Sequence, residues 1–212
     1  MNISRYSKGQ LKTIIEKNNA SRTDIPAGSS AVLIPIVEKD GELHIVFEER
    51  SHSLKFQPGD VCFPGGKVEG NESPKNCAIR ECLEELFPNG TDESYIEIIA
   101  ALPPMVGPTG NNVYPFVGFL NNYNFTYSKD EVEQVITYPI SFFENNPPLC
   151  YPMEKHTVAP SDFPADLVSN GRGYKPIIQK YDMYIYDKTS PVIWGFTGRL
   201  LHIFTNMLHN SF

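Results

Sequence analysis

Long apolar runs, closely spaced cysteines and excess positive charge are all missing from this 212-residue sequence. Its 25 acidic residues outnumber its 18 lysines and arginines, which gives a formal net charge of −7. Binding to a nucleic-acid backbone depends on Lys and Arg, so we expect no nucleic-acid partner. No apolar run approaches the ~20 residues of a spanning helix, and the polar start MNISRYSKGQLK lacks the apolar stretch of a signal peptide. We therefore expect a cytoplasmic protein with no membrane partner.

Only four cysteines occur, at Cys62, Cys77, Cys82 and Cys150. They form neither a CxxC pair nor a metal-ligand spacing, which favours reduced thiols over a disulfide framework. A chain of this length is large enough to bury a core of its own as one domain.

The pattern along the chain predicts a mixture of helices and strands. An amphipathic helix is expected within residues 5–19, in an N-terminal arm or helix over residues 1–27. SAVLIPIVEKDGELHIVFEERS reads as a hairpin that turns at Lys39-Asp40-Gly41. Further β-rich runs span 96–102, 113–120, 135–143 and 181–186, and PVIWGFTGRLLHIFTNML predicts a closing helix. Residues 144–176 are rich in Pro, Asn, Gly and Ser without periodicity, which indicates a long insertion.

The segment FPGGKVEGNESPKNCAIRECLEELF gathers an unusual number of carboxylates. Ser73 followed by Pro74 predicts that a helix begins there. One side of this helix should pack and the other should be acidic; the expected packing residues are Ile79, Leu83, Leu86 and Phe87, and the acidic side carries Glu81, Glu84 and Glu85 with Cys77 and Ala78. Like charges at these spacings destabilise a helix, so we expect a hard divalent cation beside them. An ordinary solvated helix face is the alternative.

The spacing from Gly66 to Glu72, then to Arg80-Glu81 and Glu84-Glu85, resembles the Nudix box, Gly-x5-Glu-x7-Arg-Glu-U-x-Glu-Glu-x-Gly-U, where U is a bulky aliphatic residue. Cys82 stands where an aliphatic residue is usual, and Phe87-Pro88 replace the final Gly-U. The flank FEERSHSLKFQPGDVCFPGG, together with LPPMVGPTGNNVYPFVGFL and IWGFTGRLL, is similar to the coenzyme A pyrophosphatase branch of the family.

The resemblance implies an α+β fold, a Nudix-type α/β/α sandwich with a mixed β-sheet over residues 28–212. It also implies hydrolysis of the pyrophosphate of coenzyme A or an acyl-coenzyme A, a small nucleotide substrate, to 3′,5′-ADP and 4′-phosphopantetheine or its acyl derivative. Mg²⁺ or Mn²⁺ is the implied cofactor.

The resemblance also assigns roles to individual residues. Glu81, Glu85 and the Gly66 carbonyl are the expected metal ligands, and Glu84 is either a third ligand or the catalytic base. Arg80 is expected to orient Glu72 or Glu81, and Glu131 and Glu133 are candidate bases outside the box. The expected substrate-binding residues are Arg50, Ser51, Gly65 and Gly66.

Three questions stay open from the sequence. Another nucleoside diphosphate derivative such as ADP-ribose or a dinucleoside polyphosphate could be the substrate, or the chain could be a catalytically silent Nudix-fold binding module. A homodimer is possible. The apolar residues of 144–176 are expected to pack against the pantetheine end of the site or against another subunit.

Overall fold

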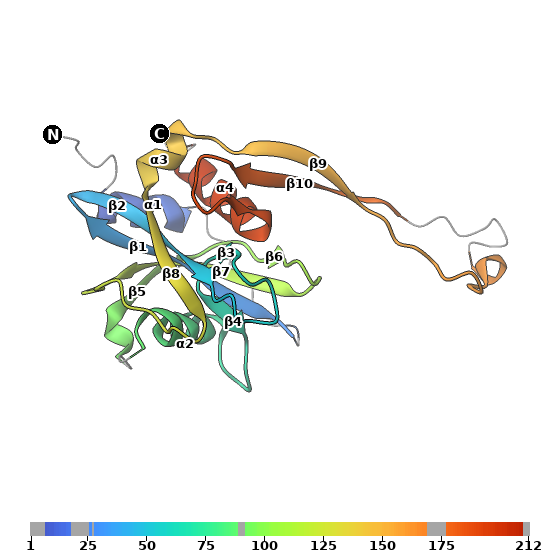
Figure 1. Ribbon diagram of the computed structural model, residues 1–212, viewed down its shortest axis with the longest axis horizontal. Helices are drawn as coiled ribbons and strands as arrows, with labels where there is room; N and C mark the ends of the chain where they lie inside the picture. Colours follow the sequence, from blue (N-terminus) through green and yellow to red (C-terminus); the bar gives the residue numbers. More distant parts are fainter. Residues whose placement is uncertain (1–6, 18–25, 27, 89–91, 169–176, 210–212) are drawn as a thin grey trace.

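A computed structural model describes residues 7–17, 26, 28–88, 92–168 and 177–209 (Figure 1). The predicted hairpin is confirmed: strand β1 (Ser30–Lys39) and strand β2 (Glu42–Arg50) pair antiparallel, with Lys39 opposite Glu42. Asp40 and Gly41 both take positive φ angles, 54° and 79°, as a tight hairpin turn between right-twisted strands requires.

The hairpin forms the centre of a mixed eight-stranded sheet. The main strand order is β3-β2-β1-β7-β5, where β3 is Val61–Cys62, β5 is Ile96–Ala101 and β7 is Asn112–Leu120. β1 and β7 run parallel, while every other pairing is antiparallel. Three more strands join this sheet: β4 (Gly65–Lys67) on β1, β6 (Met105–Val106) on β7 and β8 (Val132–Pro139) on β2. The pairing of β4 with β1 places Gly65–Lys67 beside the central strands, where the candidate site lies.

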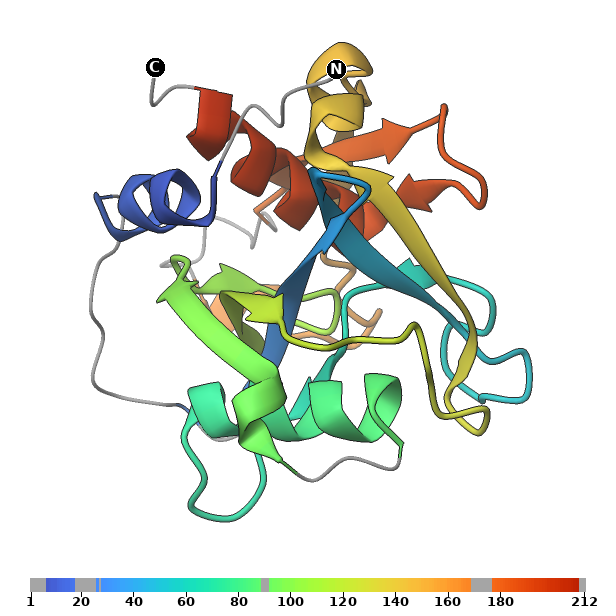
Figure 2. The same cartoon turned by 90° about the vertical axis from the view of Figure 1, so that its left-hand side faces the viewer.

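Helices cover both faces of this sheet (Figure 2). Helix α2 (Pro74–Leu86) packs on one face through an apolar cluster that includes Leu33 and Leu86. Helices α1 (Lys8–Lys17) and α4 (Gly195–His209) cover the other face with a second cluster that includes Leu11, Ile15 and Phe204. The α+β sandwich with a mixed sheet is thereby confirmed. The N-terminal helix buries Leu11 and Ile15 completely, so it forms part of the core; Tyr6 and residues 18–25 and 27 lie outside the described residues.

Helix α2 begins where the sequence predicts. The Ser73 hydroxyl accepts the Asn76 N–H at 3.1 Å, and Pro74 is the first helical residue. The predicted packing side is buried, but the prediction that only this side packs is wrong, because Cys77 and Ala78 on the acidic side are fully buried as well. Glu85 is buried with them. The β4 segment and the sheet together enclose this helix on more than one side.

The insertion predicted over residues 144–176 is more regular than its composition indicates. Helix α3 (Ile140–Asn145) ends what the sequence predicts as a β-rich run, and β9 (Leu149–Lys155) then pairs with β10 (Gln179–Tyr186). With β11 (Ile193–Trp194) these strands form a separate three-stranded sheet that projects from the body (Figure 1). Short 3₁₀ turns occur at Glu93–Tyr95 and Ala165–Leu167, and residues 169–176 lie outside the described residues.

The helices carry no membrane signature. None of those in the described ranges is long and apolar enough to cross a bilayer. The four cysteines are free: Cys77 and Cys82 are buried, Cys62 is half-buried and Cys150 is exposed.

Candidate active site

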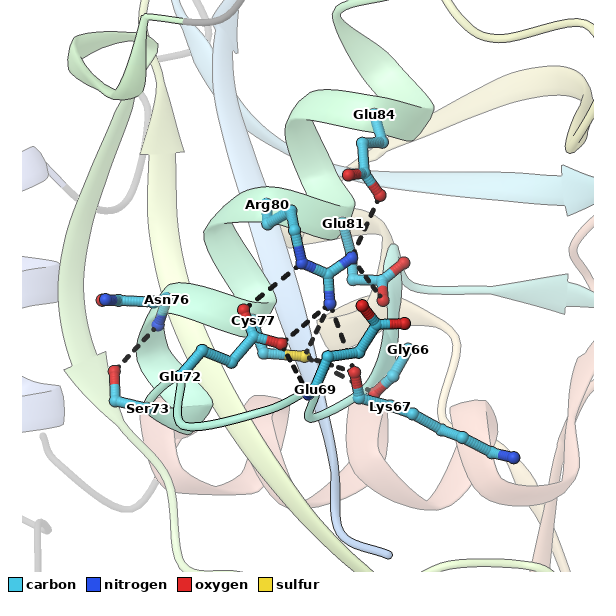
Figure 3. A network of polar contacts seen from close by, with 10 residues as sticks. All are labelled: Gly66, Lys67, Glu69, Glu72, Ser73, Asn76, Cys77, Arg80, Glu81 and Glu84. Atoms are coloured by element: carbon cyan, nitrogen blue, oxygen red, sulfur yellow. Dashed lines mark hydrogen bonds and ion pairs between the residues drawn. The ribbon is translucent and has the colours of Figure 1, made fainter.

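The two glycines of the Phe63-Pro64-Gly65-Gly66 stretch lie close to different neighbours. Gly65 pairs with Val32 of β1, and a Cβ at Gly65 would lie 2.7 Å from the Val32 Cα. A Cβ at Gly66 would instead meet the Glu81 carboxylate, with Glu81 Oε2 at 2.7 Å. The first glycine therefore permits close strand pairing, and the second leaves room for the carboxylate of Glu81 against the β4 backbone (Figure 3).

Glu85 reaches the same backbone from one turn further along α2. Its Oε2 accepts the Gly65 N–H at 2.9 Å, and the residue is only 3% exposed. Glu81 is also largely covered, with a side-chain exposure of 15%. Both predicted metal ligands thus lie against the Gly65-Gly66 segment, as the Nudix-type spacing predicts, although their ligand role stays a prediction.

Arg80 ties the loop to the helix (Figure 3). Its guanidinium donates to Glu72 Oε1 at 2.9 Å and to Glu84 Oε2 at 3.1 Å, and it forms an ion pair with Glu81 at 3.0 Å. It also donates to the Lys67 carbonyl at 3.2 Å. The hydrogen bonding of Arg80 to Glu72 holds the pKa of Glu72 below its ordinary value. Arg80 thus contacts both carboxylates that it is expected to orient, and it also binds Glu84 and the Lys67 carbonyl.

A carboxylate that the sequence reasoning missed lies beneath this site. Glu48 on β2 is 2% exposed, and its Oε1 accepts the Cys62 thiol at 3.2 Å while its Oε2 has no hydrogen-bond partner. Burial raises the pKa of Glu48 to about 7. The signal was present in HIVFEERS, because a glutamate follows directly on a run of buried strand residues.

The buried carboxylates repel one another. Burial, followed by the charges of Glu48 and Glu81, raises the pKa of Glu85 well above its ordinary value. Burial is also the main reason that the pKa of Glu81 is raised, and Glu131 adds to it. In the described part of the chain neither Glu48 nor Glu85 forms an ion pair, so both carboxylates lack a compensating cation within contact distance.

This donor set suits a hard divalent ion. Carboxylate and carbonyl oxygens are the ligands that Mg²⁺ and Mn²⁺ prefer, and the buried Glu48 oxygen without a hydrogen-bond partner is one that a proton or a cation would satisfy. Among the described residues, however, no three His, Cys, Asp or Glu side chains already converge on one point. Because Arg80 holds Glu81 in an ion pair, this carboxylate would have to turn toward a bound ion.

The candidate bases lie at the margin of this cluster. The Glu84 side chain is 55% exposed and held by Arg80. Glu131 is exposed and near enough to raise the pKa values of Glu81 and Glu85. Glu133 is exposed on β8. Glu131 is therefore the better placed of the two candidates outside the box, and its role as a base stays a prediction.

Arg50 is the last residue of β2, and Ser51 begins the loop that follows it. Arg50 donates from Nε to the Phe56 carbonyl at 3.3 Å, and Ser51 is 5% exposed with its hydroxyl 2.9 Å from that of Ser53. The Ser51 N–H donates to the Glu131 carbonyl at 2.8 Å. Ser51 thus fastens this loop to the Glu131 segment and presents little surface to a ligand, while Arg50 is half-buried.

Comparison with known proteins identifies relatives of this arrangement. A NUDIX domain model matches residues 28–148. The chain is 35% identical over 135 residues to a peroxisomal coenzyme A diphosphatase of Mus musculus, covering 63% of this chain and 55% of that protein. It is 35% identical over 124 residues to Nudix hydrolase 3 of Caenorhabditis elegans, covering 56% of this chain and 50% of that one.

The chain spans about half the length of these curated relatives. Among solved structures, the binary complex of a C. elegans Ap4A hydrolase superposes with a TM-score of 0.45 at 17% identity, covering 54% of this chain and 83% of that one.

Proposed function

This chain belongs to the Nudix family, and from that premise we propose that it is a metal-dependent pyrophosphohydrolase acting on coenzyme A or an acyl-coenzyme A. The observation that carries the proposal is the position of Glu81 and Glu85 against the Gly65-Gly66 backbone. Glu81 and Glu85 lie one turn apart, and both have raised pKa values. Arg80 forms an ion pair with Glu81 but none with Glu85, so a bound cation would balance the remaining charge.

The residues that would hold Mg²⁺ or Mn²⁺ are Glu81, Glu85 and the Gly66 carbonyl, with Glu84 as a further ligand if it is not the base. When bound, the ion supplies positive charge that stabilises the leaving phosphate and makes the attacking water more acidic. Arg80 forms ion pairs with three carboxylates, those of Glu72, Glu81 and Glu84, and so holds Glu72 and Glu81 in position beside the loop.

In the proposed reaction a water molecule attacks one phosphorus of the pyrophosphate. The bond from that phosphorus to the bridging oxygen breaks, and the leaving phosphate departs on 3′,5′-ADP or on 4′-phosphopantetheine. A carboxylate accepts the proton of the water, and Glu84 and Glu131 are the candidates. Their exposure leaves them accessible to solvent, from which the attacking water comes.

Two lines of support favour coenzyme A over other nucleoside diphosphate derivatives. The residues preceding the box, from Phe47 to Gly66, are similar to the coenzyme A pyrophosphatase branch, and the mouse relative is named as a coenzyme A diphosphatase. Arg50 at the end of β2 and Lys55 in the loop that follows are cationic and suit a substrate with three phosphates.

The test is product analysis with Mg²⁺ and each of four compounds in parallel: coenzyme A, acetyl-coenzyme A, ADP-ribose and a diadenosine polyphosphate. We expect 3′,5′-ADP from the first two and none after addition of a chelator. Cleavage of only ADP-ribose or the dinucleotide would assign another Nudix substrate. Turnover of none of them, with the protein shown to be folded, would favour a silent binding module.

A further inference from the structure

The projecting ribbon of β9 and β10 has two unlike faces. The strand register sets Leu149 opposite Ile185, Tyr151 opposite Met183 and Met153 opposite Tyr181. Residues that face each other across a pair of strands, and every second residue along each strand, lie on the same side. These six side chains therefore form one apolar face. In β11, Trp194 stands opposite Ile185 and extends this face toward the body.

The other face of the ribbon is polar near its far end and anchored near its base. Glu154 lies opposite Lys180, and the two side chains form an ion pair at 3.5 Å. At the base the Tyr184 ring stacks on His202 of α4 with 4.0 Å between ring centroids. The backbone approach there is close, because a Cβ at Gly198 of α4 would contact the Tyr184 carbonyl. The body of the protein thus holds the polar face and leaves the apolar face uncovered.

Exposure values show that most of this apolar face is uncovered in the described part of the chain, although Met183 and Ile185 are half-buried. Tyr151 is 49% exposed, Trp194 is 45%, and Leu149, Met153 and Tyr181 are 40–44%. Beyond the ribbon, Val158, Ile177 and Ile178 are also exposed. A two-stranded ribbon is marginally stable alone in water, and it needs another element against its apolar side. The apolar residues that the sequence left without a period in fact alternate along β9.

We propose that this apolar face is the surface through which two copies of the chain associate. Large side chains offer ~150–250 Å² each, so five that are nearly half exposed leave on the order of 500 Å² per copy. That is a large share of the ~800 Å² per partner of a standard interface, and the exposed residues beyond the ribbon add to it.

Charge and symmetry favour a second copy as the occupant. The chain as a whole carries −7, so two copies repel on average. Strands β9 and β10 carry two acidic residues, Glu154 and Asp182, and two basic residues, Lys155 and Lys180, so the ribbon is electrically neutral. Of these four charges only Lys155 lies on the apolar face, at its far end, so the middle of the face is uncharged and complementary to itself, as a two-fold interface requires. Association through it also leaves α2 and its carboxylates free.

The test compares two lysine substitutions at adjacent positions on opposite faces. Tyr151→Lys places a charge in the middle of the apolar face, whereas Pro152→Lys adds the same side chain to an exposed position of the polar face. Sedimentation velocity of the full chain measures the mass over a range of concentrations, and circular dichroism checks folding. We expect twice the 23.9 kDa of one chain for the wild type and Pro152→Lys, and at least a tenfold weaker association for Tyr151→Lys.

Two outcomes would overturn the proposal. A wild-type chain that is monomeric at every concentration would exclude a second copy, and its co-sedimentation with phosphatidylcholine and phosphatidylserine vesicles would assign the face to lipid. A Tyr151→Lys variant that associates like the wild type would show that copies meet elsewhere. If Tyr151→Lys does not fold, Met153→Lys, nearer the free end of the ribbon, decides by the same measurement.

Discussion

Substitution of the two adjacent glycines separates the fold from the site. In Gly66→Ala the new methyl group would overlap the Glu81 carboxylate, which is the free end of a flexible side chain and can turn away. In Gly65→Ala the methyl group would overlap backbone atoms of Ala31 and Val32 in the central strand, which cannot turn. The same chemical change thus meets a movable neighbour at one position and a fixed one at the next.

The expected magnitudes follow from that difference. Gly65→Ala should cost about 1–3 kcal/mol, as other overpacked substitutions do, and each kcal/mol lowers the melting temperature of a domain of this size by about 2–4 °C. Gly66→Ala should stay within about 0.5 kcal/mol of the wild type. Because the methyl group fills the space in which the Glu81 carboxylate turns toward a bound ion, Gly66→Ala should lower turnover or Mn²⁺ affinity by roughly 10–100-fold.

The assays are thermal unfolding, Mn²⁺ titration calorimetry and turnover of coenzyme A. The double variant Gly66→Ala with Glu81→Gln is the control, because it should lose little more activity than Glu81→Gln alone if Gly66 acts through Glu81. Wild-type Mn²⁺ affinity and turnover in Gly66→Ala would refute the reasoning. So would a loss of stability in Gly66→Ala as large as that in Gly65→Ala.

Three further predictions concern α2 and Glu48. Leu83→Ala should cost about 2–5 kcal/mol in urea unfolding while activity per folded molecule survives; an unchanged midpoint would contradict the observed packing. Glu81→Gln and Glu85→Gln should each keep the fold and lose roughly 10² or more in turnover, and near-wild-type rates at saturating Mg²⁺ would remove that ligand assignment. The folded protein holds Glu48 at a pKa of about 7 against an ordinary 4.5, so it binds the extra proton between these values. In chelator, Glu48 should therefore lower the unfolding free energy by at most on the order of 3 kcal/mol between pH 5 and pH 8. Glu48→Gln should make the fall in unfolding free energy smaller without abolishing it, because the raised pKa values of Glu81 and Glu85 act in the same direction.

Local sequence determined the elements that depend on neighbouring residues. Asp40-Gly41 specifies the hairpin turn because tight turns need positive φ angles, and Ser73-Pro74 specifies the start of α2 because the cap and the first turn are made within four residues. The spacing from Gly66 to Glu85 likewise predicted which carboxylates lie near the glycines, since helix periodicity relates positions one turn apart. The alternation of Leu149, Tyr151 and Met153 along β9 is present in the sequence, but the prolines and the polar residues around it made a strand hard to predict there.

Tertiary structure decided what depends on the pairing of distant strands. Glu48 comes to lie beneath Glu85 only because β2 pairs with β3 and β4 pairs with β1, and no local preference encodes that meeting. The burial of Cys77 and Ala78 on the side predicted to be acidic has the same origin, because β4 folds over the helix. The free face of the ribbon is likewise set by α4, which takes the side of Tyr184 and leaves that of Tyr151. Periodicity says which residues share a face, and only the packed neighbours determine which face is covered.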